Sequence, residues 1–494
     1  MKKLDQHQIE AVIEANKYHR GIIQRPTGAG KTLIQAEIVA QLLCTGKFSI
    51  TLVKAPRIML ANQLAKEYTL YLNDRLKDPQ CYVSFLVHSG ERSEILNEDD
   101  LKGLSEEEMI EALTSISSSI DSLTDRREIG KKIKWAKKNN KPLVIFTTYH
   151  SNLKVIDTIR DVRGLKTRAI DLDLNDEGHN LRSSAFHPIL TYYNPARQYH
   201  FTATLSNSKS TSGRGMNNPI YGGIISSMTA SEAISKGLIL PLKTKKLRSK
   251  LRSSVDQNDL DGAIGESIEE CFEHQEKEFP TVGVKLIVSC TGAKQIKDFI
   301  SSKNKERVRL QKRGIEILTV HSNKDLVTHN GKKITRNEFE RLKIKLGENP
   351  NAKVIIVHYN ILSEGIDVPG LTGALILRNM SLSTFVQTVG RIVRILRSNP
   401  NAKKYGVLYY PTICDPDMAR EFDERVHYLY QEGYIPVELL EEYNAKGEGD
   451  DDGDDLRDPI VGNSPTKELF IYVDELQDRF DEADSPWSIL KNYV

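Results

Sequence analysis

Apolar runs of strand length alternate with helical segments through most of the chain. Ile22 and Ile23 end one such run, and apolar side chains recur at helical spacing from Leu33 to Leu42. The glycine-rich stretch 26–32 separates them, which predicts a strand, a loop and a helix. The alternation continues in both halves, as is typical of α/β domains with parallel sheets. The pattern therefore predicts two tandem α/β domains.

The length of 494 residues exceeds that of one ordinary domain. We predict a first domain over residues 1–240, with a helical insertion at about 91–142, and a second domain over 241–440. Residues 441–494 are predicted to form a linker and a small C-terminal extension. The stretch KGEGDDDGDDLRD is acidic and rich in glycine, so the linker is expected to be disordered, as a spacer or a mimic of nucleic acid.

Composition limits the classes of protein that need to be considered. Hydrophobic residues make up 39% and charged residues 28%, which suits a globular protein in water. The net charge is +2, so affinity for a polyanion has to come from local patches. No CxxC pair occurs, so neither a zinc ribbon nor an iron–sulfur cluster is indicated. The start MKKLDQHQIE lacks an apolar signal core and no apolar run reaches membrane length, so we expect a cytoplasmic protein.

The loop between the first strand and helix reads RPTGAGKT. Glycines let backbone N–H groups point at phosphate oxygens, and the helix N-terminus adds positive potential. Lys31 can reach the β- and γ-phosphates, and the hydroxyl of Thr32 can ligate Mg²⁺. We therefore expect a nucleotide site formed by Thr27, Gly28, Ala29, Gly30, Lys31 and Thr32.

A second motif, DEGH, follows the predicted strand 169–175. Asp176 is expected to hold Mg²⁺ through water, and Glu177 to orient or deprotonate the attacking water. The strand itself carries Asp171 and Asp173, although a central parallel strand should be apolar on both faces. These carboxylates need partners, for which Arg197 and His200 are candidates, unless this face of the sheet is partly wet.

The stretch FVQTVGRIVRI contains Gln387, Arg391 and Arg394. The two arginines, three residues apart, are predicted to lie on one helix face. They can enter a phosphate site and neutralise charge that develops in the transition state. Because they are far along the chain from Lys31, we assign them to the second domain. ATP would then lie between the domains, and closure would convert hydrolysis into domain motion.

Taken in order, these motifs resemble those of superfamily 2 helicases and translocases of the DEAD/DEAH-like kind, over about residues 4–397. The chain departs from the pattern at Arg25, where the usual loop has Gly, and in DEGH, where DEAH is commoner. The resemblance implies two RecA-like domains with ATP and Mg²⁺ as cofactors. It further implies nucleotide contacts by Gln8, Gly365 and Asp367 and coupling between sites by His179, Thr202 and Thr204. The nucleic-acid contacts that it implies are Pro56, Arg57, His88, Gly90, Thr147, Thr148, Tyr149, His321 and Ser322.

The spellings APRIMLANQL and SEGIDVPGL resemble those of DNA motors, namely restriction-enzyme subunits, XPB-type repair helicases and compact bacteriophage helicases. That resemblance implies an ATP-dependent DNA helicase or translocase that acts on single-stranded, forked or branched DNA, by fork reversal, branch migration or unwinding. Two alternatives remain open. One is the motor subunit of a restriction or antiviral assembly, with a protein partner bound through the C-terminal extension. The other is an ATP-dependent RNA helicase.

Three further segments leave their roles open. The basic run from Lys243 to Arg252 is either a phosphate contact or a solvated linker. Trp135, among lysines in REIGKKIKWAKKNNK, belongs either to an element that contacts nucleic acid or to a helical hairpin packed on the first domain, and we favour the hairpin. The dipeptide Asn330-Gly331 predicts a tight hairpin with two lysines at its tip.

Overall fold

The structure is a computed structural model of the chain. The predicted linker and extension over 441–494, and the site residues Gly90, Ser322, Gly365 and Asp367, lie outside the described residues. The residues that it describes are 3–88, 121–162, 165, 169–208, 213–251, 260–301, 303–321, 323–359, 368–378, 380–395, 403–413 and 416–436.

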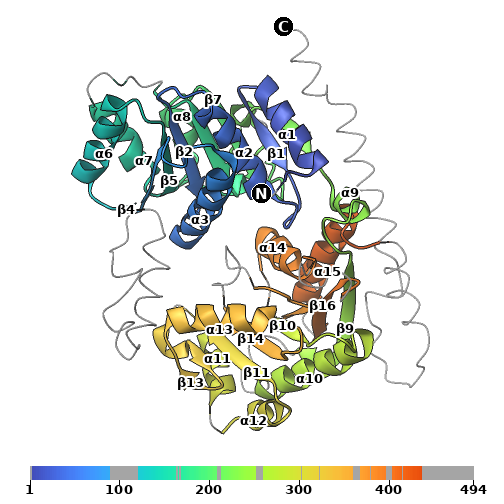
Figure 1. Ribbon diagram of the computed structural model, residues 1–494. Helices are drawn as coiled ribbons and strands as arrows, with labels where there is room; N and C mark the ends of the chain where they lie inside the picture. The colour runs from blue at the N-terminus through green and yellow to red at the C-terminus, as the bar shows by residue number, and fades with distance from the viewer. Residues whose placement is uncertain are drawn as a thin grey trace. The chain divides into compact units, whose positions relative to one another are not determined.

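Sheet A contains eight strands in the order β4-β3-β5-β2-β6-β7-β1-β8, and its described neighbours pair in parallel (Figure 1). Parallel strands end at one edge of a sheet, so the loops that follow β1, β2, β5 and β6 share that edge. The strands are β1 (Arg20–Gln24), β2 (Ile50–Ala55), β3 (Val83–Val87), β4 (Ser122–Leu123), β5 (Leu143–Thr148), β6 (Leu172–Asp176), β7 (Arg197–Thr202) and β8 (Ile224–Ser227).

Two apolar clusters cover the faces of sheet A. Leu52 and Val53 are neighbours in β2 but belong to different clusters, because successive strand residues point to opposite faces. One cluster includes side chains of α1 (Gln6–Lys17), α2 (Lys31–Leu43) and α3 (Ile58–Arg75). The other includes α6 (Arg126–Lys138), α7 (Asn152–Asp161), α8 (Ile189–Tyr192) and the 3₁₀ turns η2 (Gly178–Arg182) and η3 (Pro219–Tyr221).

Sheet B has the order β13-β12-β11-β14-β10-β15-β16-β9 and is parallel except for an antiparallel hairpin at one edge. Two parallel-sheet α/β halves confirm the predicted fold class. The strands are β9 (Leu242–Leu251), β10 (Lys285–Ser289), β11 (Glu316–Val320), β12 (Thr328–His329), β13 (Lys332–Lys333), β14 (Val354–His358), β15 (Gly373–Ile376) and β16 (Gly406–Ile413).

Phe272, Ile296 and Leu310 come from helices around sheet B and share one buried cluster with the strand residues Leu286 and Val357. No helix in the described part of the chain is long and apolar enough to cross a membrane. The remaining elements are α9 (Ala230–Ser235), α10 (Leu260–Glu278), α11 (Ala293–Ile300), α12 (Lys305–Lys312), η4 (Lys324–Leu326), α13 (Arg336–Glu348), α14 (Leu382–Ile392) and α15 (Pro416–Gln431).

The basic run that begins at Lys243 is part of a strand. It lies in β9, which pairs in parallel with β16 at the edge of sheet B. The prediction of a solvated linker here was therefore wrong. Lysines are common on edge strands because their charge discourages pairing with another chain. Lys243 and Lys245 alternate with the buried residues Leu242 and Thr244, as on a strand with one buried face.

The hairpin predicted from Asn330-Gly331 is confirmed. These residues join β12 to β13 with φ values of 54° and 80°, as a tight turn requires. The Asn330 side chain accepts a hydrogen bond from the backbone N–H of Ile317 at 2.9 Å, which fixes the turn against β11. At the tip, Lys333 pairs with Asp325 at 2.7 Å.

Candidate functional site

The stretch 26–32, here called the phosphate loop, joins β1 to α2. Gly28 and Gly30 have φ values of +94° and +76°, which side chains disfavour and glycine adopts readily. Lys31 begins α2, and its Nζ donates to the carbonyl oxygen of Arg25 at 3.1 Å. The ammonium group of Lys31 thus lies close to the backbone of the loop. A bound phosphate would compete with the neutral Arg25 carbonyl for this group.

Arg25 stands where the usual loop has glycine, and its side chain runs away from the loop toward β8. Its guanidinium donates to the carbonyl oxygen of Gln24 and to the hydroxyl of Ser226, both at 2.7 Å. The residue is only 3% exposed, and burial lowers the pKa of its guanidinium to about 10. Arg25 therefore ties the start of the loop to the neighbouring strand.

Gln8 reaches the phosphate loop from α1. Its Oε1 accepts a hydrogen bond from the backbone N–H of Asp5 at 2.9 Å, and its Nε2 lies 3.4 Å from the carbonyl oxygen of Gly30. The side chain is buried. The structure thus brings Gln8 to the nucleotide loop, as the resemblance implied, and shows that it also caps the first turn of α1.

Asp176 and Glu177 end β6 beside the phosphate loop. Asp176 accepts a hydrogen bond from Gln35 Nε2 at 2.8 Å, and Gln35 Oε1 accepts one from the Tyr68 hydroxyl, also at 2.8 Å. Burial, reinforced by the neighbouring Glu177 charge, raises the pKa of Asp176 to about 7. Glu177 has a φ of 51°, an unfavourable left-handed conformation that turns its carboxylate away from the line of the strand. Sequence reasoning missed Gln35 and Tyr68, which are ordinary residues at helical spacing.

The residues at this edge fit a magnesium nucleotide. The Thr27 hydroxyl and Glu177 Oε2 are buried, yet neither makes a hydrogen bond with the residues that the structure describes. Buried polar atoms of this kind usually have a partner, so they are suited to a ligand. The set also offers the ammonium of Lys31, the hydroxyl of Thr32 and the carboxylate of Asp176, and Mg²⁺ prefers such oxygen ligands with phosphate.

Three residues expected to couple the sites lie together beyond Glu177. His179 Nδ1 lies 3.1 Å from the Thr202 hydroxyl, which in turn donates to the carbonyl oxygen of Thr204 at 2.7 Å. The same His179 nitrogen lies 3.5 Å from Glu177 Oε2. Three polar contacts therefore connect the loop after β7 to the Glu177 carboxylate, so a movement of that loop would change the surroundings of the carboxylate.

Gln387 and Arg391 lie on α14, which meets the phosphate loop. A Cβ added to Gly390 would come within 2.3 Å of Thr27 Cβ, so the helix backbone lies directly against this residue. A Cβ added to Gly28 would come within 3.5 Å of Arg394 Cγ. The helix ends at Ile392, so Arg394 follows it rather than sharing its face with Arg391 as predicted.

Several predicted nucleic-acid contacts are buried. His88, Thr147, Thr148 and Tyr149 are each at most 3% exposed. The Tyr149 hydroxyl donates to the backbone carbonyl of Asp176 at 2.6 Å and so supports the acidic motif instead. Their side chains are covered, so a contact with nucleic acid at these four positions would involve backbone atoms, and the four stay predictions. A short motif does not reveal which face of its strand is covered.

The positions of Pro56 and Arg57 are consistent with a contact to nucleic acid at the protein surface. They follow β2 at the carboxyl edge of sheet A, Pro56 is half-buried and Arg57 is exposed. Arg57 also occupies the position just before the first turn of α3. Backbone N–H groups of a helix N-terminus and an exposed guanidinium can both bind phosphate oxygens.

A stack of cationic and aromatic groups follows three strands of sheet B. His321 is stacked on Tyr359, with ring centroids 6.1 Å apart and planes at 20°. The Arg378 guanidinium carbon lies 5.0 Å from the centroid of the same Tyr359 ring. Sequence reasoning found His321 but missed the other two. Each directly follows a strand, or stands two residues beyond its end, which is where parallel sheets place functional side chains.

The expected partners of the two strand carboxylates were wrong. Asp173 accepts hydrogen bonds from Lys54, Tyr193 and Gln198, not from Arg197 or His200. Asp171 accepts a hydrogen bond from the backbone N–H of Ile50 at 2.9 Å. Asp173 is thus buried with three hydrogen-bond donors on one of its oxygens, whereas Asp171, at the start of the strand, is partly exposed.

An open hollow of about 480 Å³ lies beyond η2. Two arginine side chains reach it, and guanidinium groups suit phosphate oxygens. Arg182 also donates to the hydroxyl of Ser206. The lining residues are Arg182, Ser183, Ser208, Gly213, Arg214 and Gly215.

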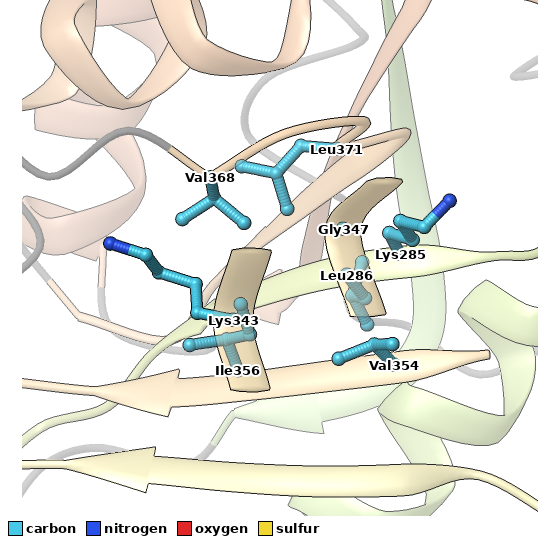
Figure 2. Close-up of a pocket in the computed structure, with 8 residues that line it drawn as sticks. All are labelled: Lys285, Leu286, Lys343, Gly347, Val354, Ile356, Val368 and Leu371. Atoms are coloured by element: carbon cyan, nitrogen blue, oxygen red, sulfur yellow. The ribbon is translucent and has the colours of Figure 1, made fainter. Parts of the chain in front are cut away.

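A second gap lies beside α13, at the edge of sheet B where the strands β10 and β14 begin (Figure 2). Its wall includes Lys285 and Lys343, whose amino groups point away from one another and out of the gap. The gap has no room for a water molecule, so it is a packing defect rather than a ligand site. Its apolar wall is made by Leu286, Val354, Ile356, Val368 and Leu371.

Comparison with known proteins identifies the fold. Residues 1–207 match the family of the type III restriction enzyme res subunit. The chain is similar to the ATP-dependent Type ISP restriction-modification enzyme LlaBIII bound to DNA, with a TM-score of 0.60 and 19% identity over 86% of this chain and 29% of that one. The chain has the motor fold of superfamily 2 helicases and translocases. The resemblance drawn from the motifs is thereby confirmed.

Two further solved structures show the same fold. A nuclease-deletion mutant of the Type ISP enzyme LlaGI in complex with a DNA substrate mimic has a TM-score of 0.56 and 17% identity, over 98% of this chain and 34% of that one. A variant of Dbp5 from S. cerevisiae bound to RNA and ADP BeF3 has a TM-score of 0.50 and 15% identity, over 90% and 93%. No curated protein matches.

The chain spans about a third of the length of the restriction-modification enzymes that it matches. Identities below 20% show a shared fold and not a shared substrate. Together with the family match over 1–207, the fold supports a nucleic-acid-dependent ATPase of the helicase type.

Proposed function

We propose that this superfamily 2 motor is an ATP-dependent DNA helicase or translocase that unwinds or remodels branched DNA. The observation that supports a motor function is the close approach of α14 to the phosphate loop. Gly390 lies against Thr27, and Arg394 lies beside Gly28. A nucleotide held by the loop would thus meet residues from both halves of the chain. Its hydrolysis would change the contacts between them.

In the proposed ATP site, residues 27–32 surround the phosphates and Gln8 contacts the adenine. Lys31 would exchange the Arg25 carbonyl for β- and γ-phosphate oxygens, a stronger, charge-assisted interaction. Mg²⁺, held through Thr32 and Asp176, would supply charge neutralisation on those oxygens when bound. Gly365 and Asp367 remain predicted contacts of the nucleotide.

Glu177 is the proposed base that orients the attacking water, because its Oε2 is buried and makes no hydrogen bond with a described residue. His179 would report the state of this carboxylate to Thr202 and Thr204. Gln387 and Arg391 on α14, and Arg394 two residues beyond its end, would stabilise the charge that develops on the transferred phosphoryl group.

The proposed grip on nucleic acid uses groups at the carboxyl edges of both sheets. Arg57 and the stack of His321, Tyr359 and Arg378 offer cationic groups and aromatic faces. The arginine-lined hollow beyond η2 offers further cations for phosphate. Such contacts are salt-dependent and largely independent of sequence.

DNA is favoured over RNA by the family match and by the two Type ISP enzymes, whose structures contain DNA or a DNA substrate mimic. A role in fork reversal or branch migration rests on the amino-acid sequences of the motifs alone. The second candidate is a motor subunit of a restriction assembly, with a nuclease partner bound through the C-terminal extension. The match of residues 1–207 to the res subunit of a type III restriction enzyme favours this candidate.

The test is the steady-state ATPase rate without nucleic acid and with single-stranded DNA, duplex, fork, four-way junction and RNA, at one fixed salt concentration. Strongest stimulation by a fork or junction supports DNA remodelling. Strongest stimulation by RNA overturns the choice of DNA. Absence of any stimulation, together with a co-purifying nuclease that is lost on truncation after Gly447, would favour the restriction assembly.

A further inference from the structure

The helix α6 carries a concentration of positive charge that the proposed ATP site and nucleic-acid grip do not use. Its 13 residues RREIGKKIKWAKK include seven basic residues and one acidic residue, whereas the whole chain has a net charge of only +2. Ile129, Ile133 and Ala136 are fully buried and fix the helix on sheet A. The packed face confirms that this segment is a helix docked on the first sheet.

The opposite face of α6 is an exposed stripe. Arg127, Lys131, Lys134, Trp135 and Lys138 recur at spacings of three and four residues, so they lie on one side of the helix. All five are exposed, and Trp135 is 52% exposed. Among the described residues, none of the four cationic side chains makes a hydrogen bond or ion pair. The acidic residues nearby are Asp125 and Glu128 at the start of the helix, Asp121, which pairs with Lys132, and Asp161, which pairs with Arg126.

The position of the helix connects this stripe to the edge that carries the motifs. The strand β4 pairs with the end of β3 at Val87, and α6 begins three residues after it. Because sheet A is parallel, the start of α6 lies at the carboxyl edge, where Pro56 and Arg57 also lie. The stripe from Arg127 to Lys138 then extends for about 16 Å, at 1.5 Å per residue.

We propose that the stripe on α6 is a binding surface for single-stranded nucleic acid, on which the cations contact phosphates and Trp135 stacks on a base. Trp135 presents a half-exposed indole ring amid cations, and base stacking on such a ring requires an unpaired strand. The inference deepens the proposed function and rests on it for the choice of nucleic acid as the partner. The proposed surface would extend the grip on nucleic acid along α6, away from the ATP site.

Tryptophan emission tests the proposal in the full-length chain, which has only two tryptophans, Trp135 and Trp487. The variant Trp487→Phe makes Trp135 the sole reporter. Single-stranded oligo(dT) should quench its emission, since stacking places a base on the ring. Poly-glutamate of equal charge should not. Unchanged emission at saturating oligo(dT), equal quenching by poly-glutamate, or quenching by duplex alone would overturn the proposal.

Affinity for a labelled oligo(dT), measured by anisotropy at several salt concentrations, tests the cations. The triple variant Lys131→Gln, Lys134→Gln, Lys138→Gln should bind more weakly and lower the slope of log K against log salt by about 2, since each single-strand phosphate contact contributes about 0.7. Trp135→Ala should weaken binding by about five- to hundredfold, the range for loss of one stacked base.

The matched control is Lys303→Gln, Lys305→Gln, Lys312→Gln, which removes the same charge from exposed positions at α12. It should change affinity and slope little. An α6 variant that binds like this control would contradict the proposal. Basal ATPase should be the same in all variants, and binding is measured without hydrolysis. A chain that binds through α6 but is not stimulated by any nucleic acid would therefore refute the proposed function and not the surface.

Discussion

Lys54 Nζ lies 2.8 Å from the carboxylate of Asp173, and both side chains are completely buried within sheet A. The Tyr193 hydroxyl and Gln198 Nε2 donate to the same carboxylate at 2.8 and 2.7 Å. Lys54 stands two residues before Pro56, and Asp173 three residues before Asp176. A charged network thus joins the strand that leads to a predicted nucleic-acid loop to the strand that leads to the proposed catalytic carboxylates.

Breaking this pair from one side should destabilise the protein strongly. Lys54→Met leaves Asp173 buried and charged without its cation, which costs about 3–5 kcal/mol in comparable pairs. The double variant Lys54→Met, Asp173→Leu removes both charges and should recover part of that loss. Urea unfolding of the two variants and of Asp173→Leu completes the cycle. Strictly additive losses would show that the two charges do not stabilise each other.

Gly390→Ala should slow nucleic-acid-stimulated hydrolysis. The new methyl would come within 2.3 Å of Thr27 Cβ and push α14 away from the phosphate loop. A misplacement near 1 Å can lower turnover by about 10²-fold. Gly292→Ala is the matched control, since it adds a methyl to open space with an extended backbone in the same half of the chain. Equal rates for the two variants would mean that this approach is not needed for turnover.

Gln35→Leu should raise the Mg²⁺ concentration needed for half-maximal ATPase activity. Gln35 holds one oxygen of Asp176 at 2.8 Å and is itself held by Tyr68. Loss of such a supporting hydrogen bond typically weakens metal affinity by about 10- to 100-fold. The milder variant Tyr68→Phe should give a smaller shift in the same direction. A Mg²⁺ titration identical to that of the wild type would contradict the role given to Asp176.

Lys403 should make stability rise with pH above neutrality. Burial, reinforced by the charge of Lys285, lowers the pKa of Lys403 to about 7 from 10.5. Between these values the unfolded chain binds a proton that the folded chain does not, so the free energy of unfolding rises by up to about 1.4 kcal/mol per pH unit. Below pH 7 both states are charged, and the full cost of burying the ammonium group applies.

Urea unfolding from pH 7.5 to 9.5 measures this dependence. Lys403→Met should remove it, because a neutral side chain of similar length then fills the site. Lys404→Met, at the exposed neighbouring position, should keep it. The same slope in both variants would show that Lys403 is charged in the folded protein, held by the carbonyl oxygens of Leu371 and Ile392.

Local motifs predicted the parts of the site that are close in sequence. Each of these parts spans only a few consecutive residues, and the local backbone conformation determines where its polar groups lie. They are the phosphate loop, the acidic motif and the Asn330-Gly331 hairpin. The partner of Asp173 could not be predicted in this way. It depends on β2 pairing with β6 in the register that sets Leu52 opposite Asp173, which brings Lys54 to a carboxylate 119 residues away in the sequence.

Two further features could not be predicted from short motifs, namely which residues are buried and where a helix ends. Tyr149 and Arg57 stand in similar short motifs, yet the first is buried under the acidic strand and the second is exposed at a helix N-terminus. Arg394 was placed on a helix that ends two residues earlier. Which side of a strand is covered, and where a helix stops, are decided by packing between segments that lie far apart in the chain.

The most direct test of the account is Glu177→Gln, assayed for ATP binding and for stimulated hydrolysis in parallel. The amide keeps the size of the side chain but cannot accept a proton, so ATP should still bind while turnover falls by at least about 10²-fold. Loss of both would mean that Glu177 holds the nucleotide rather than the water. Near-normal hydrolysis would contradict the assignment of the site.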